Sequence, residues 1–348
     1  MTSSPVLRLT SLSHGGGCGC KLAPAVLDRL VRHVGQHVPV PPELLVGIET
    51  RDDAAVYRLA PDQAIVATTD FFMPIVDDPF DFGAIAATNA LSDVYAMGAR
   101  PLFALSLLAM PIATLPEAAI ARILAGGDAA CRRAGVPIAG GHSVDSVEPI
   151  YGLVAIGLVD PRRMKRNADA RAGDRLVLGK PLGVGIYGAA LKKQALTDVQ
   201  YAELIATTTQ LNSAGMALAS LEGVHAMTDV TGFGLLGHLL EVCRGSGAGA
   251  DVRIADVPLL RDARALAASG HLTGGSARNW QSCGEAVDLG ACDLVDRALL
   301  TDPQTSGGLL VSCAPDAVDA VLDTFVREGF AHAAVIGAMT PGAGIAVR

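Results

Sequence analysis

The sequence predicts an α/β protein built from two halves of similar size. Strand-like apolar runs alternate with stretches of helical periodicity in both halves, which is the pattern of α/β folds. The chain has 348 residues, enough for two domains with a core each. Over residues 161–173 the charge rises and the apolar periodicity lapses. We therefore expect a Gly- and Cys-rich arm and lead-in over residues 1–48, an N-terminal α/β domain over 49–160 and a C-terminal α/β domain over 161–348.

The first half is expected to begin with a strand that ends at Asp70. A helix over 82–97 follows, with Asp81 as its N-cap and Gly98 at its end. A strand at 102–108, a helix at 116–134 closed by Gly135, and strands at 136–139 and 150–159 complete this half.

The second half repeats this alternation. The expected strands are 175–178, a short run that ends at Asp229, 251–254, 309–313 and 333–336, and the expected helices are 185–193, 199–221 and 233–243.

The composition narrows the class of protein. Lys and Arg number 27 against 35 Asp and Glu, a net charge of −8, so the chain lacks the positive field of nucleic-acid-binding proteins. No apolar run reaches the roughly 20 residues of a membrane-spanning helix, and Met1–Leu12 lacks the apolar core of a signal peptide. The seven cysteines, odd in number and mostly in apolar sequence, indicate reduced thiols. We expect a cytoplasmic protein with no nucleic-acid or membrane partner.

Aspartates stand out as candidate ligands. Asp52 and Asp53 are adjacent in a turn, Asp70 and Asp229 close strands, and Asp93 lies in the middle of an otherwise apolar helix. A buried, ionised Asp needs a cation, and carboxylates without nearby His or Cys suit Mg²⁺ bound to phosphates. The alternative for each one is a helix cap or a turn.

Two glycine-rich segments could contact phosphate through backbone N–H groups. Gly140–Ser143 follows a predicted strand, and residues 302–308 precede another. Neither has the sequence of a P-loop or of a dinucleotide-binding fingerprint, so each also fits a simple turn. The function of the 302–308 segment stays open.

The segment His14–Lys21 is the most unusual in the chain. Cys18 and Cys20 lie beside Lys21, whose charge favours a reactive thiolate. The two cysteines could also be half of a zinc site, but no second close Cys/His pair completes it. The remaining alternative is a disordered tail, although such a tail has no need of two thiols next to a lysine.

Together these motifs resemble the selenophosphate synthetase (selenide, water dikinase) family. The resemblance runs in order over nearly the whole chain, and the Cys-Gly-Cys-Lys run separates this branch from aminoimidazole ribonucleotide synthetase and thiamine-monophosphate kinase. The matching segments are His14–Lys21, Glu49–Val56, Ala87–Asp93, Ala139–Ser143, Thr228–Gly237 and Asp302–Leu310.

The resemblance implies a two-domain fold like that of aminoimidazole ribonucleotide synthetase, with the N-terminal domain at the core of a homodimer. It implies a phosphotransferase reaction in which ATP, selenide and water give selenophosphate, AMP and phosphate. Cys18 and Lys21 match the essential catalytic residues, and Asp53, Asp93 and Asp229 match ligands of several Mg²⁺ ions. The segments that contact nucleotide match Lys21, Thr50, Arg51, Asp52, Asp70, Asp93, Gly141, His142 and Ser143.

Two other functions stay open at this point. Another ATP-dependent enzyme of the superfamily, an amidine-forming synthetase or a small-molecule kinase, would not need Cys18. A carrier that binds selenium or zinc through its cysteines would not use ATP. Selenium could reach the enzyme from a delivery protein, and Cys20 has no assigned role.

Overall fold

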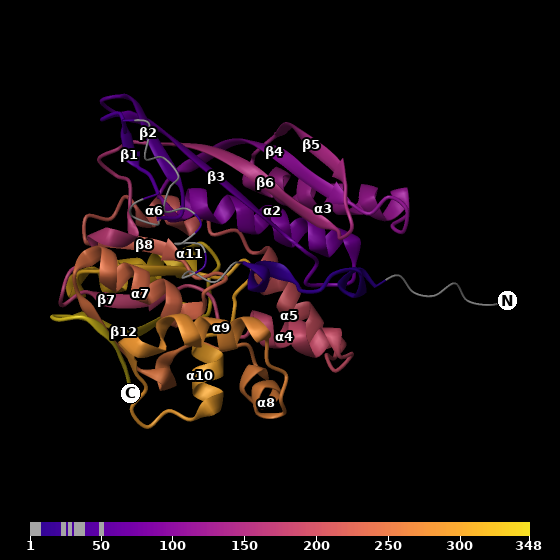
Figure 1. Ribbon diagram of the computed structural model, residues 1–348. Helices are drawn as coiled ribbons and strands as arrows, with labels where there is room; N and C mark the ends of the chain where they lie inside the picture. The colour runs from indigo at the N-terminus through magenta and orange to yellow at the C-terminus, as the bar shows by residue number, and fades with distance from the viewer. Residues whose placement is uncertain (1–7, 22–25, 27–29, 31–38, 49–51) are drawn as a thin grey trace.

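The computed structural model describes residues 8–21, 26, 30, 39–48 and 52–348. These residues form two β-sheets with helices packed against them, so the predicted α/β class is confirmed (Figure 1). No helix among them is long and apolar enough to cross a membrane.

The first sheet has six strands in the order β1-β2-β3-β6-β4-β5. Helices α2 (Pro79–Ala96) and α3 (Glu117–Ala134) cover one of its faces (Figure 1). The pair packs closely because a Cβ atom on Gly83 would lie 1.8 Å from the carbonyl oxygen of Ile123. The strands are β1 (Leu44–Val46), β2 (Ala55–Ala60), β3 (Gln63–Phe72), β4 (Arg100–Met110), β5 (Ile138–Asp145) and β6 (Ile150–Val159).

The second sheet has seven strands in the order β10-β13-β9-β12-β7-β11-β8. Its strands are β7 (Arg175–Leu178), β8 (Val224–Asp229), β9 (Gly249–Val252), β10 (Val287–Asp288), β11 (Leu309–Cys313), β12 (Ala334–Thr340) and β13 (Gly344–Val347). The helices of this half are α4 (Val184–Lys192), α5 (Asp198–Thr209), α6 (Ala214–Leu218), α7 (Gly234–Ser246), α8 (Ala263–Ala268), α9 (Gly274–Cys283), α10 (Leu294–Leu300) and α11 (Val318–Arg327).

The structure corrects several predicted boundaries. Asp78, not Asp81, caps α2: its carboxylate accepts from the N–H groups of Phe80 and Asp81, and the proline at the first helical position fits this start. The predicted helix over 199–221 is two helices, α5 and α6. The strand predicted to end at Asp70 continues to Phe72, because β6 pairs with it over that whole length.

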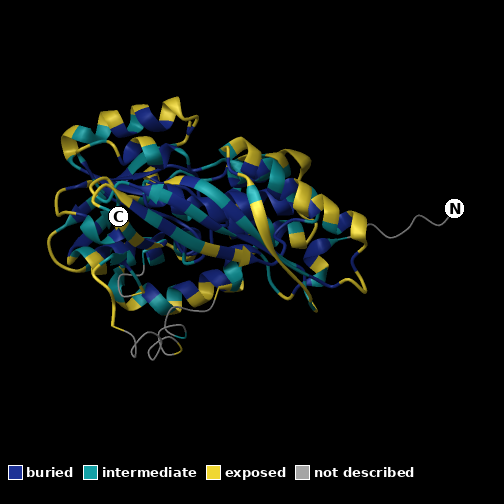
Figure 2. Cartoon of the chain, turned by 90° about the horizontal axis from the view of Figure 1, so that it is seen from above, coloured by how far each residue is buried: buried dark blue, intermediate teal, exposed yellow. Residues whose placement is uncertain are grey.

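The second face of the six-stranded sheet has no helix over it among the described residues. Figure 2, which views the molecule from above, shows the strands of this sheet uncovered, with an exposed strand at one edge. Val154 lies on this face, because Leu153 and Ala155 on either side of it are fully buried against the helices. Its neighbours across the strands are Leu105 and Thr69. This face is therefore apolar and only half-buried.

Candidate active site

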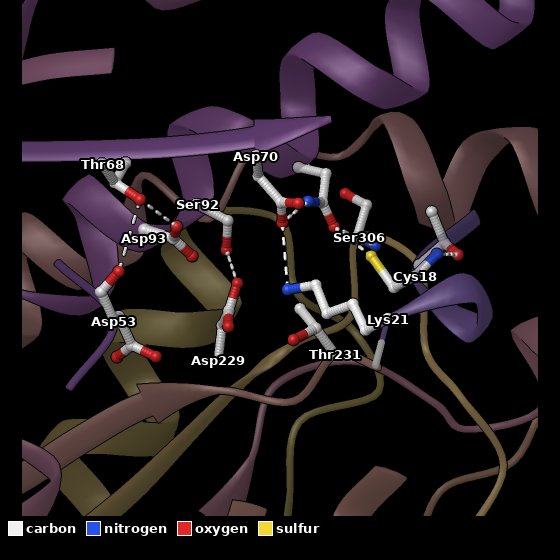
Figure 3. A network of polar contacts seen from close by, with 12 residues as sticks. Cys18, Lys21, Asp53, Thr68, Asp70, Ser92, Asp93, Asp229, Thr231 and Ser306 are labelled. Carbon is white, nitrogen blue, oxygen red and sulfur yellow. Dashed lines mark hydrogen bonds and ion pairs between the residues drawn. The ribbon is translucent and has the colours of Figure 1, made fainter. Parts of the chain in front are cut away.

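Three aspartates from distant parts of the chain meet between the two sheets (Figure 3). Asp53 precedes β2, Asp93 lies on α2 and Asp229 ends β8, and one carboxylate oxygen from each lies within 4.8 Å of the others. No sequence spacing predicts this convergence. Each carboxylate is oriented by one hydroxyl: the donors are Thr228 to Asp53 (2.8 Å), Thr68 to Asp93 (2.6 Å) and Ser92 to Asp229 (2.5 Å).

The aspartate cluster suits a hard divalent cation. Burial raises the pKa of all three carboxyl groups, and for Asp53 and Asp93 the charge of Asp229 raises the pKa further. The second carboxylate oxygen of Asp53 is buried and accepts no hydrogen bond from the described residues. Three convergent carboxylates with an unpartnered oxygen need positive charge between them. The residues thus fit the Mg²⁺ ligand set that the family resemblance implies.

A second network connects Cys18 to Lys21 through two residues of the N-terminal half (Figure 3). The Cys18 thiol donates to Oδ1 of Asn89 at 3.3 Å. Nδ2 of Asn89 donates to Asp70 at 2.5 Å, and Asp70 pairs with the Lys21 ammonium at 3.3 Å. Asn89 lies one turn before Asp93 on α2, so the two networks share one helix face. The Cys18 thiol is therefore joined to the helix that also carries Asp93 of the aspartate cluster.

The protonation of Cys18 differs from the expectation of a thiolate. Its side chain is 1% exposed, and burial followed by the charge of Asp70 raises its pKa well above the usual range, although Lys21 opposes this. The positive charge of Lys21 is directed at Asp70 instead of the sulfur. Cys18 is accordingly a thiol here, which agrees with its hydrogen bond to Asn89. A thiolate requires a change in the charges around it.

The described part of the arm, residues 8–21, is fixed to both halves of the chain. The His14 ring pairs with Glu148 at 2.9 Å, and Arg278 donates to the Gly19 carbonyl at 2.7 Å. Two further contacts join Lys192 to the Ser13 carbonyl (3.3 Å) and the Gly17 N–H to the Met73 carbonyl (2.8 Å). Gly17–Cys20 forms a short 3-10 turn that places Cys18 inward.

The 302–308 segment, whose role the sequence leaves open, completes the Cys18 environment. Thr305 accepts a hydrogen bond from the Cys18 N–H at 3.0 Å, and the Ser306 N–H donates to Asn89 at 2.8 Å. Ser306 has a φ of 54°, rare for a residue with a side chain, and its carbonyl accepts from the buried ammonium of Lys180 at 2.9 Å. Such strained backbone is concentrated at functional sites. The loop is therefore part of the site.

We predict that Thr305→Val loosens the arm. Valine keeps the shape of threonine but removes the acceptor for the Cys18 N–H, and one hydrogen bond of about 1 kcal/mol corresponds to a roughly fivefold rise in the open population. Alkylation of Cys18 by N-ethylmaleimide, followed by mass spectrometry, should accelerate by that factor. Thr305→Ser, which keeps the hydroxyl, should react like the wild type. Equal rates in all three proteins would show that this bond does not hold the arm.

The remaining predicted site residues are placed differently. The Asp52 carboxylate accepts from the Asn167 N–H at 2.7 Å, at the start of the second half. Thr50 and Arg51 lie outside the described residues. Gly141, His142 and Ser143 were expected in a loop after a strand, but they lie within β5, because residues 141–145 pair in parallel with β4. This exposed edge strand is separated from β3 and Asp70 by β6 and β4, and its contact with nucleotide stays a prediction.

Sequence reasoning missed the residues that orient the reactive groups. Asn89 lies within the matching segment Ala87–Asp93, and Thr305 and Ser306 lie in the 302–308 segment, but the sequence predicts no role for any of the three. The hydroxyl donors have no signal of their own, because they come from separate strands and a helix. They are Thr68, Ser92 and Thr228.

Comparison with known proteins identifies the family. Residues 51–159 match the family model of the AIR synthase related protein N-terminal domain, and residues 171–348 match that of the corresponding C-terminal domain. The chain is 64% identical to a selenide, water dikinase of Burkholderia pseudomallei over 98% of this chain and 97% of the relative. It is 53% identical to the selenide, water dikinase of Rhizobium meliloti, over 97% of this chain and 96% of the relative. The chain belongs to the selenide, water dikinase family.

Solved structures show the same fold at low identity. A thiamine-monophosphate kinase of Stenotrophomonas maltophilia has a TM-score of 0.64 at 23% identity and covers 93% of this chain and 95% of its own. A hydrogenase maturation protein in complex with ATP has a TM-score of 0.61 at 21% identity. The match covers 96% of this chain and 90% of that protein. The predicted two-domain superfamily architecture is thus confirmed, and the dikinase family is distinguished within it by the full-length relatives.

Proposed function

We propose that this chain is a selenide, water dikinase that makes selenophosphate from ATP, selenide and water and releases AMP and phosphate. The observation that carries the proposal is the position of Cys18. Its thiol is joined through Asn89 and Asp70 to Lys21, beside three aspartates that can hold a metal-bound triphosphate. A superfamily enzyme that handles no selenium does not require a thiol at this point.

In this proposal the aspartates and the arm have different functions. Asp53, Asp93 and Asp229 would hold Mg²⁺, which would neutralise negative charge on the phosphate groups of ATP. Lys21 lies on the thiol side of this cluster and is positioned to stabilise negative charge on the transferred group. Asn89 and Thr305 hold Cys18 in place, and the closed arm excludes water from the first transfer.

The reaction has two phosphoryl acceptors, selenide and water. Selenium attacks the γ-phosphorus and the bond to the β-bridging oxygen breaks, which leaves selenophosphate and ADP. Water then takes the β-phosphoryl group, giving phosphate and AMP. In this proposal ADP stays bound between the two transfers, because release after the first would make ADP the product.

A carrier function is less well supported. Among the described residues, the one group of three or more potential metal-binding side chains is the aspartate cluster, and it contains no cysteine. All seven cysteines are free thiols, so reduced conditions suit the protein, and we propose a cytoplasmic location. A selenium-delivery protein remains a proposed partner.

We also propose that the chain is a homodimer that pairs through the uncovered face of the six-stranded sheet. This half-buried apolar face includes Val154 and its neighbour Leu105. Exposed contiguous apolar surface of this kind marks an interaction site. A second copy would bury it.

Val154→Arg should therefore convert the dimer to a monomer. A charged side chain at the centre of a dry interface costs several kcal/mol when it is left unpaired, while it can reach water in the monomer. Sedimentation velocity measures the change in mass. Leu124→Arg on the exposed side of α3 is the control and should leave the mass unchanged. A monomeric wild type, or a dimeric Val154→Arg protein, would contradict the proposed interface.

The function is tested by the nucleotide products. The protein is incubated anaerobically with ATP, Mg²⁺ and a reductant, with or without selenide, and the nucleotides are separated by chromatography. We expect AMP in the presence of selenide and little turnover in its absence. ADP as the final product would indicate a kinase of the superfamily, and no turnover would indicate a carrier.

A further inference from the structure

A large cavity lies beside the arm, and none of the three clustered aspartates lines it. Its volume is about 680 Å³, and it is bounded by the arm, α4 and the start of α9. Cys20 and Lys21 line it, whereas Cys18 and the three clustered aspartates do not. Lys21, which pairs with Asp70, and Thr305, which accepts from the Cys18 N–H, both line the cavity, so it borders the proposed site.

The charge of the cavity is opposite to that of the chain. Its described lining includes Lys21, Lys192, Lys193 and Arg278 and contains no Asp or Glu. Lys21 pairs with Asp70, but no carboxylate among the described residues pairs with Lys192, Lys193 or Arg278. In a chain with a net charge of −8 these three cations are a local departure. A concave surface of one sign concentrates ions of the opposite sign and raises their rate of association. The lining thus favours a small anion.

The size of the cavity indicates how the anion is handled. Hydrogen selenide is a monoanion at neutral pH and contains a single heavy atom, so about 680 Å³ holds it with its water shell. Such a space does not strip water from an ion as a tight binding site does. It suits a vestibule, which raises the local concentration of the anion before it reaches the reactive atoms.

We propose that this cavity is the vestibule through which the anionic selenium substrate approaches Cys18 and the γ-phosphate. This inference rests on the proposed function. Selenide would then reach the phosphorus from the arm side and the nucleotide would lie on the aspartate side. An in-line transfer requires the attacking and leaving groups on opposite sides of the phosphorus, and this arrangement supplies that requirement.

Lys193→Glu tests the vestibule with little effect on the arm. The Lys193 ammonium donates to the Gly270 carbonyl at 3.3 Å, whereas Lys192 and Arg278 hold carbonyls of the arm. We expect kcat/KM for selenide to fall about tenfold at low ionic strength, because one cation of the field is reversed. The difference should shrink in 0.5 M KCl, where the Debye length falls to a few ångströms. The KM for ATP should not change.

The control is Arg132→Glu, which reverses a charge on α3 outside the cavity and should leave both constants unchanged. A wild type that makes no AMP from selenide would refute the proposed function itself. An active wild type whose Lys193→Glu variant behaves like Arg132→Glu would refute the vestibule alone. An equal rise in the KM for ATP would assign the cavity to the nucleotide instead and would also overturn the proposal.

Alkylation gives a second readout that does not depend on turnover. Cys20 lines the cavity, and Cys292 lies near the carboxylates of Asp293 and Asp296. We expect the ratio of the rates with anionic iodoacetate and neutral iodoacetamide, measured by mass spectrometry, to be about tenfold higher at Cys20 than at Cys292. Lys193→Glu should lower the ratio at Cys20 only. Equal ratios at the two cysteines would contradict a cavity that attracts anions.

Discussion

Replacement of Cys18 by serine is expected to abolish selenide-dependent formation of AMP while the protein still binds ATP. Serine is nearly the same size, and its hydroxyl can donate to Asn89 as the thiol does, so the arm should stay in place. What is lost is a soft, polarisable sulfur that can handle selenium and that ionises far more easily than a hydroxyl. We expect turnover to fall at least about a thousandfold, as when an essential catalytic side chain is removed.

The matched control for this variant is Cys292→Ser, a change of the same kind at a half-buried cysteine outside the site. It should keep wild-type turnover. ATP binding, followed by isothermal titration in the presence of Mg²⁺, should be similar in all three proteins. Full selenide-dependent activity in Cys18→Ser would show that the thiol has no role in the reaction, and loss of ATP binding would show that it acts on the nucleotide instead.

Asp93→Asn is expected to make the metal-free protein more stable and at the same time inactive. The three clustered carboxylates repel one another, and burial followed by the charges of Asp229 and Asp70 raises the pKa of Asp93. Asparagine removes one of these charges and keeps an oxygen that can accept from Thr68. The Tm without metal should rise by a few degrees, since about 1 kcal/mol moves the Tm of a large domain by ~2–4 °C.

With Mg²⁺ the wild type should have a higher Tm than Asp93→Asn. Metal binding stabilises the wild type by mass action, whereas the variant has lost a ligand and should gain much less. Its turnover with ATP should fall at least about a hundredfold. Asp128→Asn on α3, an exposed carboxylate paired with Arg132, is the control and should change neither Tm nor turnover. An unchanged response to Mg²⁺ in Asp93→Asn would mean that Asp93 is only structural.

The sequence was sufficient for the fold class, because the class depends on local patterns. The grouping of Asp53, Asp93 and Asp229 came from the family resemblance instead. Asp93 in an apolar helix is unusual enough to indicate a ligand from one position alone. The predicted thiolate at Cys18 was wrong, because the protonation state depends on contacts between distant parts of the chain. Adjacency to Lys21 in the sequence suggests a thiolate, but in the fold burial and then the charge of Asp70 raise the pKa of Cys18. Asp70, which pairs with Lys21, comes from a strand 49 residues further along the chain.

The role of the 302–308 loop could not be predicted from the sequence, because it also depends on tertiary contacts. Its turn-like composition is visible in the sequence, but its contacts with Cys18 and Asn89 depend on how the two halves pack. The segment Gly140–Ser143 shows the reverse error. Glycine suggested a loop, whereas pairing with β4 makes it part of an edge strand. For Gly140–Ser143, strand pairing outweighs the local preference of glycine for a loop.

The central claim is that selenium accepts the γ-phosphoryl group of ATP at this site. Phosphorus NMR with selenide enriched in selenium-77 tests it most directly, because a bond between phosphorus and selenium splits the phosphorus signal. We expect a split signal that grows in step with AMP and phosphate and is absent for Cys18→Ser. AMP and phosphate without any split signal, or a split signal that forms equally well with Cys18→Ser, would contradict the claim.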